Sequence, residues 1–322
     1  MKNKILATLV AFGLVGSASA IEINDNLSIN GFIDGSINKV DSQVANADTG
    51  NWGLDEIEVN FLFNVDSVSG LVAVDTQNIG TVGDDDLEIE QAHFTYSLDN
   101  GVSLTFGRYG SAAGLEREDP SGLYTYSRAY GSTPFNLGDV DNNAREGLRI
   151  SYAAEAWTLG VSIENPTGTI RTTGISTKND LDYEATLNYT GVENLNFNVG
   201  YAKINAVLAT DDVDVVNVNA TYQVGKALLG AEYTELGQTA ANGGDLDAML
   251  ILVDYDVSDK LGVAVRYSTY EASTNVDVDK ITIAPNYAIT ESLGAILEYS
   301  DISHDTAGQD SDEIALELTY TF

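Results

Sequence analysis

The sequence is poor in positive charge and contains no cysteine. Its 322 residues include 15 Lys and Arg against 49 Asp and Glu, which gives a formal net charge of −34. A nucleic-acid-binding protein needs clustered positive charge, so this composition excludes that class. The absence of cysteine excludes both a disulfide framework and thiolate chemistry.

Histidine is almost as scarce, with two residues in the chain. His93 falls inside a predicted strand and His304 inside a predicted loop, and neither is accompanied by a G-x-S-x-G or H-E-x-x-H motif. Without such a motif, an isolated histidine gives no support for catalysis. The sequence therefore predicts a protein that is not an enzyme.

Long hydrophobic runs are also missing. Beyond residue 20 the longest clean apolar run covers residues 248–253, well short of the roughly 18 residues that a transmembrane helix requires. A hydropathy plot alone would therefore place the chain among soluble proteins.

The N-terminus has the three parts of a secretory signal. Lys2 and Lys4 precede an apolar stretch at 5–15, and Ala18-Ser19-Ala20 follows as a small-residue cleavage site. An uncleaved membrane anchor is the alternative interpretation, but the apolar stretch is too short to span a bilayer. We expect a cleaved signal peptide at 1–20 and one exported domain at 21–322.

In many segments of the chain, apolar and polar residues alternate with a period of two. In residues 314–322 the apolar side chains occupy one parity, while Ala, Glu and Thr occupy the other. A membrane β-barrel conceals its lipid-facing surface in this way, because every second residue faces hydrocarbon and the others face a wet interior. Sixteen segments are predicted as strands: 27–37, 55–65, 70–79, 86–98, 102–109, 145–154, 156–164, 179–190, 194–204, 212–224, 226–236, 244–256, 260–271, 277–289, 292–301 and 311–322.

Two of these segments depart from simple alternation. Segment 86–98 changes parity midway, so we expect a β-bulge near Glu90 or Gln91. Residues 248–253 are apolar on both faces, which indicates that a loop packs against them from inside the barrel.

The connections between segments alternate between short and long. They are short after even-numbered segments, as at 66–69 and 99–101. After odd-numbered segments they are longer and acidic or Gly-rich, as at 38–54, 110–144, 165–178 and 302–310. Outer-membrane barrels have tight periplasmic turns and longer external loops, which is the asymmetry seen here.

Tyrosines recur at intervals close to 33 residues near the strand ends. One series lies near the ends of even-numbered segments: Tyr96, Tyr152, Tyr189, Tyr222, Tyr255, Tyr287 and Tyr320. A second series lies near the far ends of odd-numbered segments: Tyr201, Tyr233, Tyr267 and Tyr299. In a closed barrel they form two aromatic girdles at the membrane interfaces, where amphipathic rings are most stable. Helical repeats also have periods in this range, but each unit here alternates at two rather than 3.6.

The C-terminal strand and the long connection resemble those of known outer-membrane proteins. An alternating final strand ending in Phe322 is similar to the assembly signal of Gram-negative outer-membrane barrels, and sixteen strands resemble the general-diffusion porins. The segment "LTFGRYGSAAGLEREDPSGLYTYSRAYG" (104–131) also resembles OmpL-like β-barrel porins, in which a strand ending in Gly-Arg leads into a long loop containing Ser-Arg.

This resemblance implies an all-β, antiparallel transmembrane β-barrel of about 16 strands in the cell outer membrane. It implies that the third external loop, 110–144, is folded into the lumen. It further implies a homotrimer that contacts outer-membrane lipid and lipopolysaccharide, and recognition of the C-terminal strand by the outer-membrane assembly machinery.

Basic residues, scarce elsewhere, gather around this loop. We expect Arg145 and Arg149 to face the lumen, because Leu148 and Ile150 take the lipid-facing parity. In one interpretation these arginines face acidic groups of the folded-in loop and tune ion selectivity. In the other, they only hold the loop to the wall through salt bridges. The predicted pore constriction comprises Arg108, Glu116, Arg117, Glu118, Asp119, Arg128, Arg145 and Arg149.

The predicted function is passive diffusion of ions and small hydrophilic solutes, with a cation preference suggested by the overall acidity. A structural or adhesin barrel without an open pore is the alternative. No cofactor or resident metal is expected, although the acidic loops could bind divalent cations. Segment 139–147 begins like a calcium loop, but Ala144 replaces the required Gly and Ile150 the required Glu, so we expect no EF-hand.

Overall fold

The computed structural model describes residues 20–77, 87–116, 119–131, 144–165, 181–205, 212–237, 244–273 and 276–322. Within these ranges the chain forms seventeen strands and one short 3-10 helix. The described part of the chain has no helix that combines the length and apolar character needed to cross a membrane.

The sixteen longer strands correspond one to one with the predicted segments. They are β2 (Leu27–Ser42), β3 (Thr49–Val65), β4 (Val68–Gln77), β5 (Glu88–Ser97), β6 (Val102–Tyr109), β7 (Arg145–Ala153), β8 (Trp157–Glu164), β9 (Asp182–Tyr189), β10 (Leu195–Ile204), β11 (Val213–Val224), β12 (Ala227–Gly237), β13 (Leu246–Asp256), β14 (Leu261–Ser273), β15 (Val276–Ala288), β16 (Leu293–His304) and β17 (Ser311–Thr321). The first long connection is shorter than predicted, because β2 and β3 extend into it and leave only residues 43–48.

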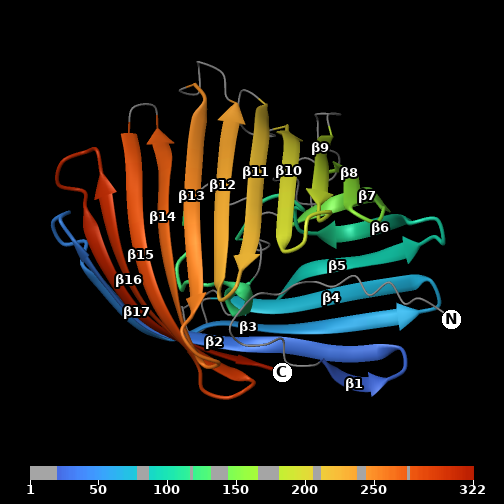
Figure 1. Ribbon diagram of the computed structural model, residues 1–322, viewed down its shortest axis with the longest axis horizontal. Helices are drawn as coiled ribbons and strands as arrows, with labels where there is room; N and C mark the ends of the chain where they lie inside the picture. The colour runs from blue at the N-terminus through green and yellow to red at the C-terminus, as the bar shows by residue number, and fades with distance from the viewer. Residues whose placement is uncertain are drawn as a thin grey trace.

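The strands form a closed antiparallel barrel. Each strand from β2 onward pairs with the next, and β17 pairs with β2, so the two ends of the sheet meet (Figure 1). At this seam Phe322 N–H donates to the Gly31 carbonyl, and Gly31 N–H donates to the Phe322 carbonyl, each at 3.0 Å. A closed sheet has no free edge whose backbone groups would be left without partners in hydrocarbon.

A seventeenth strand, β1 (Ile21–Asn24), was not predicted because four residues are too few to show alternation. It pairs with the first residues of β2, where Ile21 lies opposite Ile29. The partner of β2 changes along its length, because β17 pairs with the part from Phe32 to Ser42. The two ends of the barrel sequence therefore lie in line along one edge of β2.

Alternation places apolar side chains outside and polar side chains inside. On β17, Ile314, Leu316 and Leu318 are 39–51% exposed on the outer face. The intervening Glu317 and Thr319 point inward and are at most 5% exposed. Inward-facing polar residues recur around the barrel, including Asp34, Glu58, Asp75, Glu184, Asn217, Thr234, Ser268, Thr282 and Ser300. A wall with this pattern suits lipid on one side and water on the other.

The predicted bulge on β5 is confirmed. Ala73 pairs with Gln91 while the next residue, Val74, pairs with Ile89, so Glu90 is the extra residue. An unpredicted bulge occurs on β3, where Asp34 pairs with Glu56 and Gly35 with Leu54. Each bulge resets the parity, which keeps the apolar residues on the outer face.

The described parts of the long connection between β6 and β7, residues 110–116 and 119–131, run inside the barrel (Figure 1). The 3-10 helix η1 (Pro120–Gly122) of this connection packs against β2 and β17. Ala113, Ala129 and Tyr130 join an apolar cluster that includes Leu250 and Leu252 of β13. For the described residues, both the inward fold of this loop and its packing on 248–253 are therefore confirmed; we call residues 110–116 and 119–131 the lumenal loop.

Candidate pore constriction

Side chains of the barrel wall hold the first part of the lumenal loop by its backbone. Glu184 of β9 accepts the N–H of Ala112 at 3.0 Å, Asn217 of β11 accepts the N–H of Gly114 at 3.3 Å, and Glu232 of β12 accepts the N–H of Leu115. A hydrogen bond contributes about 0.5–1.5 kcal/mol when both groups are neutral, as at Asn217, and about 1.5–3 kcal/mol when one is charged. Together these acceptors attach the loop to three strands.

Small residues allow the close approach of loop and wall. Gly200 of β10 lies so near the loop that a Cβ atom there would meet the Cβ of Ala113 at 2.6 Å. Gly230 of β12 lies under Leu115, whose Cδ2 would be 3.2 Å from an added Cβ. The loop rests directly on the sheet at these two positions.

An ion pair between Glu116 and Arg266 lies at the centre of the loop contacts. Arg266 of β14 is fully buried, and its Nη1 is 2.5 Å from Oε1 of Glu116. The same nitrogen donates to Thr125 Oγ1 and to the Ser127 carbonyl, both at 2.8 Å. The other oxygen of Glu116 accepts the Ala129 N–H at 2.7 Å. This pair therefore joins two parts of the loop to each other and to the wall.

The far part of the loop reaches β16 and β2. Ser127 donates through its N–H and its hydroxyl to Glu298 of β16, and Lys280 of β15 donates to the Ser127 hydroxyl. The Tyr126 hydroxyl accepts from Asn38 Nδ2 of β2 at 2.8 Å. Burial raises the pKa of Tyr126, so this phenol stays neutral at physiological pH. The loop thus crosses the lumen from β9 to β2.

The partners of Arg145 and Arg149 differ from those of the first interpretation. Arg149 Nη2 lies 3.1 Å from Glu184 and donates to the Gly110 carbonyl at 2.9 Å, while Arg145 lies 3.4 Å from Glu164 of β8. The idea that these arginines face acidic loop groups is wrong for the described residues, where both pair with carboxylates of the wall. Register explains this, because Arg149, Ser162 and Glu184 lie in one row across β7, β8 and β9, and the small Ser162 lets the Arg149 side chain reach Glu184.

The remaining predicted constriction residues are dispersed. Arg108 donates to the Glu90 carbonyl at 2.6 Å on β5, and Arg128 donates to the Glu116 carbonyl at 2.9 Å within the loop. Arg117 and Glu118 lie outside the described residues. The structure therefore brings Glu116 and Arg128 together and leaves Arg108 on the wall.

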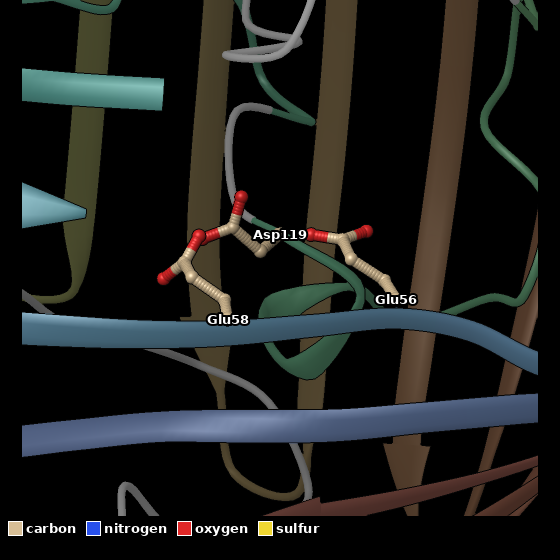
Figure 2. Close-up of side chains that lie close together, drawn as sticks. All are labelled: Glu56, Glu58 and Asp119. Atoms are coloured by element: carbon tan, nitrogen blue, oxygen red, sulfur yellow. The ribbon is translucent and has the colours of Figure 1, made fainter. Parts of the chain in front are cut away.

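A cluster of carboxylates lies where the loop meets β3. Figure 2 shows Glu56 and Glu58 of β3 beside Asp119 of the loop, and each offers an oxygen within 4.8 Å of the others. Each of the three residues also takes part in further interactions. Glu56 and Glu58 were missed in the sequence, although they share the inward parity of Asn60.

The predicted girdle tyrosines all project from the outer face. Among the second series, Tyr201 donates to Asp214 at 2.6 Å and Tyr267 donates to Asp279 at 2.7 Å. In the first series, Tyr189 stacks against Trp157 with a centroid distance of 4.1 Å. Their location at membrane interfaces remains a prediction, as does the role of Phe322 in assembly.

Comparison with known proteins gives one family match. A family model described as Gram-negative porin matches residues 6–308. No curated protein is similar enough to the chain to match it.

Solved structures resemble the fold over nearly the whole chain. OmpF of Salmonella typhi, in a complex with daunomycin, has a TM-score of 0.72 at 14% identity, with 94% of this chain and 100% of that chain covered. The outer-membrane channel DcaP of Acinetobacter baumannii has a TM-score of 0.70 at 16% identity, covering 95% and 100%. An anion-selective porin from Comamonas acidovorans has a TM-score of 0.70 at 12% identity, covering 92% and 99%. At these identities the likeness concerns the fold.

Proposed function

Because the chain belongs to the family of Gram-negative porins and is therefore an outer-membrane diffusion channel, we propose that it passes ions and small hydrophilic solutes and prefers cations. The observation that supports this most is the closed sixteen-stranded barrel with inward-facing polar residues. Barrels of sixteen to eighteen strands leave an aqueous channel, whereas barrels of about eight fill with side chains. Transport is passive, and we propose no catalytic role.

The cation preference rests on the distribution of lumenal charge. Inward carboxylates gather on β2 to β5, at Asp34, Glu56, Glu58, Asp75 and Glu90. The lumenal arginines of β7 pair with Glu164 and Glu184, so their charge is offset locally. Charges more than about 8 Å from the ion path are screened at physiological salt, so groups beside the narrowed lumen matter most.

Planar-bilayer recording tests the pore itself. The folded barrel should give stepwise currents that rise linearly with voltage. A structural or adhesin barrel without an open pore should give none, and that result would contradict the proposed function.

Neutralising two carboxylates should weaken the cation preference. With Glu56→Gln and Glu58→Gln combined, we expect the cation-to-anion permeability ratio to fall about two- to fivefold, because a unit charge 4 Å away stabilises an ion by about 1 kcal/mol in water. The reversal potential in a KCl gradient measures this ratio. Glu235→Gln on the exposed outer face of β12 is the matched control and should leave it unchanged. An unchanged ratio in the double variant would exclude this wall as the source of selectivity.

The remaining features are proposed on family grounds. We propose a homotrimer; a solved relative in fold, OmpT of Vibrio cholerae, is described in a trimer form. We also propose contacts with lipid and lipopolysaccharide, recognition of the strand ending at Phe322 by the assembly machinery, and removal of residues 1–20 as a signal peptide. Binding of divalent cations by the acidic loops stays a prediction, and residues 84–86 and 209–211 of those loops lie outside the described ranges.

A further inference from the structure

A cavity of about 540 Å³ lies between the lumenal loop and the short-turn ends of β9 to β13. Its volume falls within the range of about 300–1,000 Å³ typical of small-molecule sites. It is separate from the carboxylate cluster, because neither Glu56 nor Glu58 lines it. Its chemistry differs from that of the constriction and indicates a different role.

Amide and hydroxyl groups form one side of the cavity. Asn188, Asn198 and Asn219 are direct cross-strand neighbours on β9, β10 and β11, and Asn196 lies opposite Thr221 in the adjacent row. Strand register thus gathers side chains from three strands into one continuous polar surface. An amide both donates and accepts hydrogen bonds, as does a hydroxyl, so this surface can bind groups that also do both.

Part of this hydrogen-bonding capacity is unused within the protein. Asn198 is 8% exposed and lines the cavity, and its Oδ1 has no hydrogen-bond partner among the described residues. Asn188 Nδ2 donates to Asn196 Oδ1 at 2.5 Å, which leaves the Asn196 Nδ2 hydrogens without an acceptor among the described residues. A buried polar atom without a partner costs free energy, and a ligand hydroxyl can recover it.

The cavity also has an apolar lining. The loop contributes Leu115, Leu123 and Tyr124, and the wall contributes Leu228 of β12 and Leu252 of β13. A ligand in this space meets both hydrogen-bonding groups and carbon surface.

Few of the described residues that line the cavity are charged. They are the acidic residues Glu116 and Glu193, and no Lys, Arg or Asp of the described ranges lines the cavity. Glu116 is bound by Arg266, and Glu193 belongs to the exposed turn between β9 and β10. An ionic solute gains little here compared with bulk water, whereas an uncharged solute can exchange its water contacts for amide and aromatic contacts.

We propose that this cavity is a weak binding site for uncharged polyhydroxylated solutes of sugar size on their way through the pore. Hydroxyl groups at the ligand edge bond to Asn196 and Asn198, and the C–H face of the ring packs against Tyr124. The inference rests on the proposed diffusion function and adds a solute class to it.

Single-channel recording with added sucrose tests the site. In the wild-type protein we expect sucrose to reduce the current in a saturable manner, whereas polyethylene glycol of equal hydrodynamic radius should reduce it only in proportion to concentration. Asn196→Leu and Tyr124→Ala should each raise the half-blocking sucrose concentration about fivefold or more, as loss of one or two ligand contacts would do. Asn64→Leu, at an exposed asparagine on the inward parity of β3 and outside the cavity, is the matched control and should behave as wild type.

The possible results distinguish a failure of the proposed sugar site from a failure of the proposed pore function. If sucrose and polyethylene glycol act alike, or if both cavity variants keep the wild-type half-blocking concentration, the pore stands and the sugar site is refuted. If the folded wild-type barrel carries no current at all, the proposed function fails and the site fails with it. Asn196 is exposed, so Asn196→Leu leaves the packing of the wall intact and keeps the test independent of folding.

Discussion

Replacing Arg266 with Met is expected to destabilise the barrel by roughly 3–5 kcal/mol and to turn its steady current into fluctuating levels, because breaking a buried ion pair leaves an uncompensated charge. Arg266 is fully buried and binds both Glu116 and the backbone of Ser127. Without it, the Glu116 carboxylate loses its counter-charge and the two parts of the loop lose their common partner. Thermal unfolding in detergent and single-channel recording measure the two effects.

A double variant distinguishes the effect of the unpaired charge on stability from the effect of the lost contacts to the loop. Arg266→Met combined with Glu116→Gln removes both charges, so it should regain part of the lost stability, since a neutral amide is far less costly to bury than an unpaired carboxylate. The loop should still fluctuate, because the contacts to Thr125 and Ser127 are lost in both variants. Wild-type stability and a single current level in Arg266→Met would show that the pair does not hold the loop.

Substitution of Gly31 by Val is expected to reduce the yield of folded barrel severely. A Cβ atom at this position would meet the Glu58 carbonyl oxygen at 2.1 Å and the Phe322 ring at 2.9 Å. Overpacking costs typically 1–3 kcal/mol, and a collision with backbone is at the upper end because no rotamer change relieves it. Gly31 also forms both hydrogen bonds that join the last residue to β2, so the collision falls on the seam.

The matched control for this prediction lies on the neighbouring strand. A Cβ atom at Gly53 of β3 would meet no atom within 4 Å, so Gly53→Val should fold as wild type. Refolding yield in detergent can be followed by the difference in gel mobility between unheated and boiled samples. Equal yields for the two variants would mean that the seam tolerates displacement at Gly31.

Alternation predicted the strands well because it reports a local property, namely which side of the sheet each residue faces. The bulge at Glu90 was accessible for the same reason, since a change of parity within one strand has few other causes. The inward position of the lumenal loop followed from resemblance. The bulge at Asp55 was not predicted, because the predicted strand begins at residue 55 and therefore contains no residue before the bulge from which a change of parity could be recognised.

The site was harder to predict because it depends on which distant strands the loop crosses. Arg266 was not predicted as a site residue, because no local pattern connects this inward arginine of β14 to Glu116, which is 150 positions away. Glu232 and Glu298 likewise follow the ordinary alternation of their strands. The parity of a residue predicts which side of the barrel wall its side chain faces. Which inward residues contact the loop depends on the path of the loop, and parity does not predict that path.

The first part of the loop is attached to the wall through three of its backbone N–H groups. Glu184, Asn217 and Glu232 bind main-chain N–H groups, which every residue except proline supplies. The wall therefore recognises the course of the loop at these positions, and the three hydrogen bonds require no particular side chain at position 112. The other two positions are restricted, because Gly114 has a φ of 97° and Leu115 packs over Gly230. Substitutions at position 112 other than proline keep all three attachments, which makes this position the first choice for altering what the channel admits.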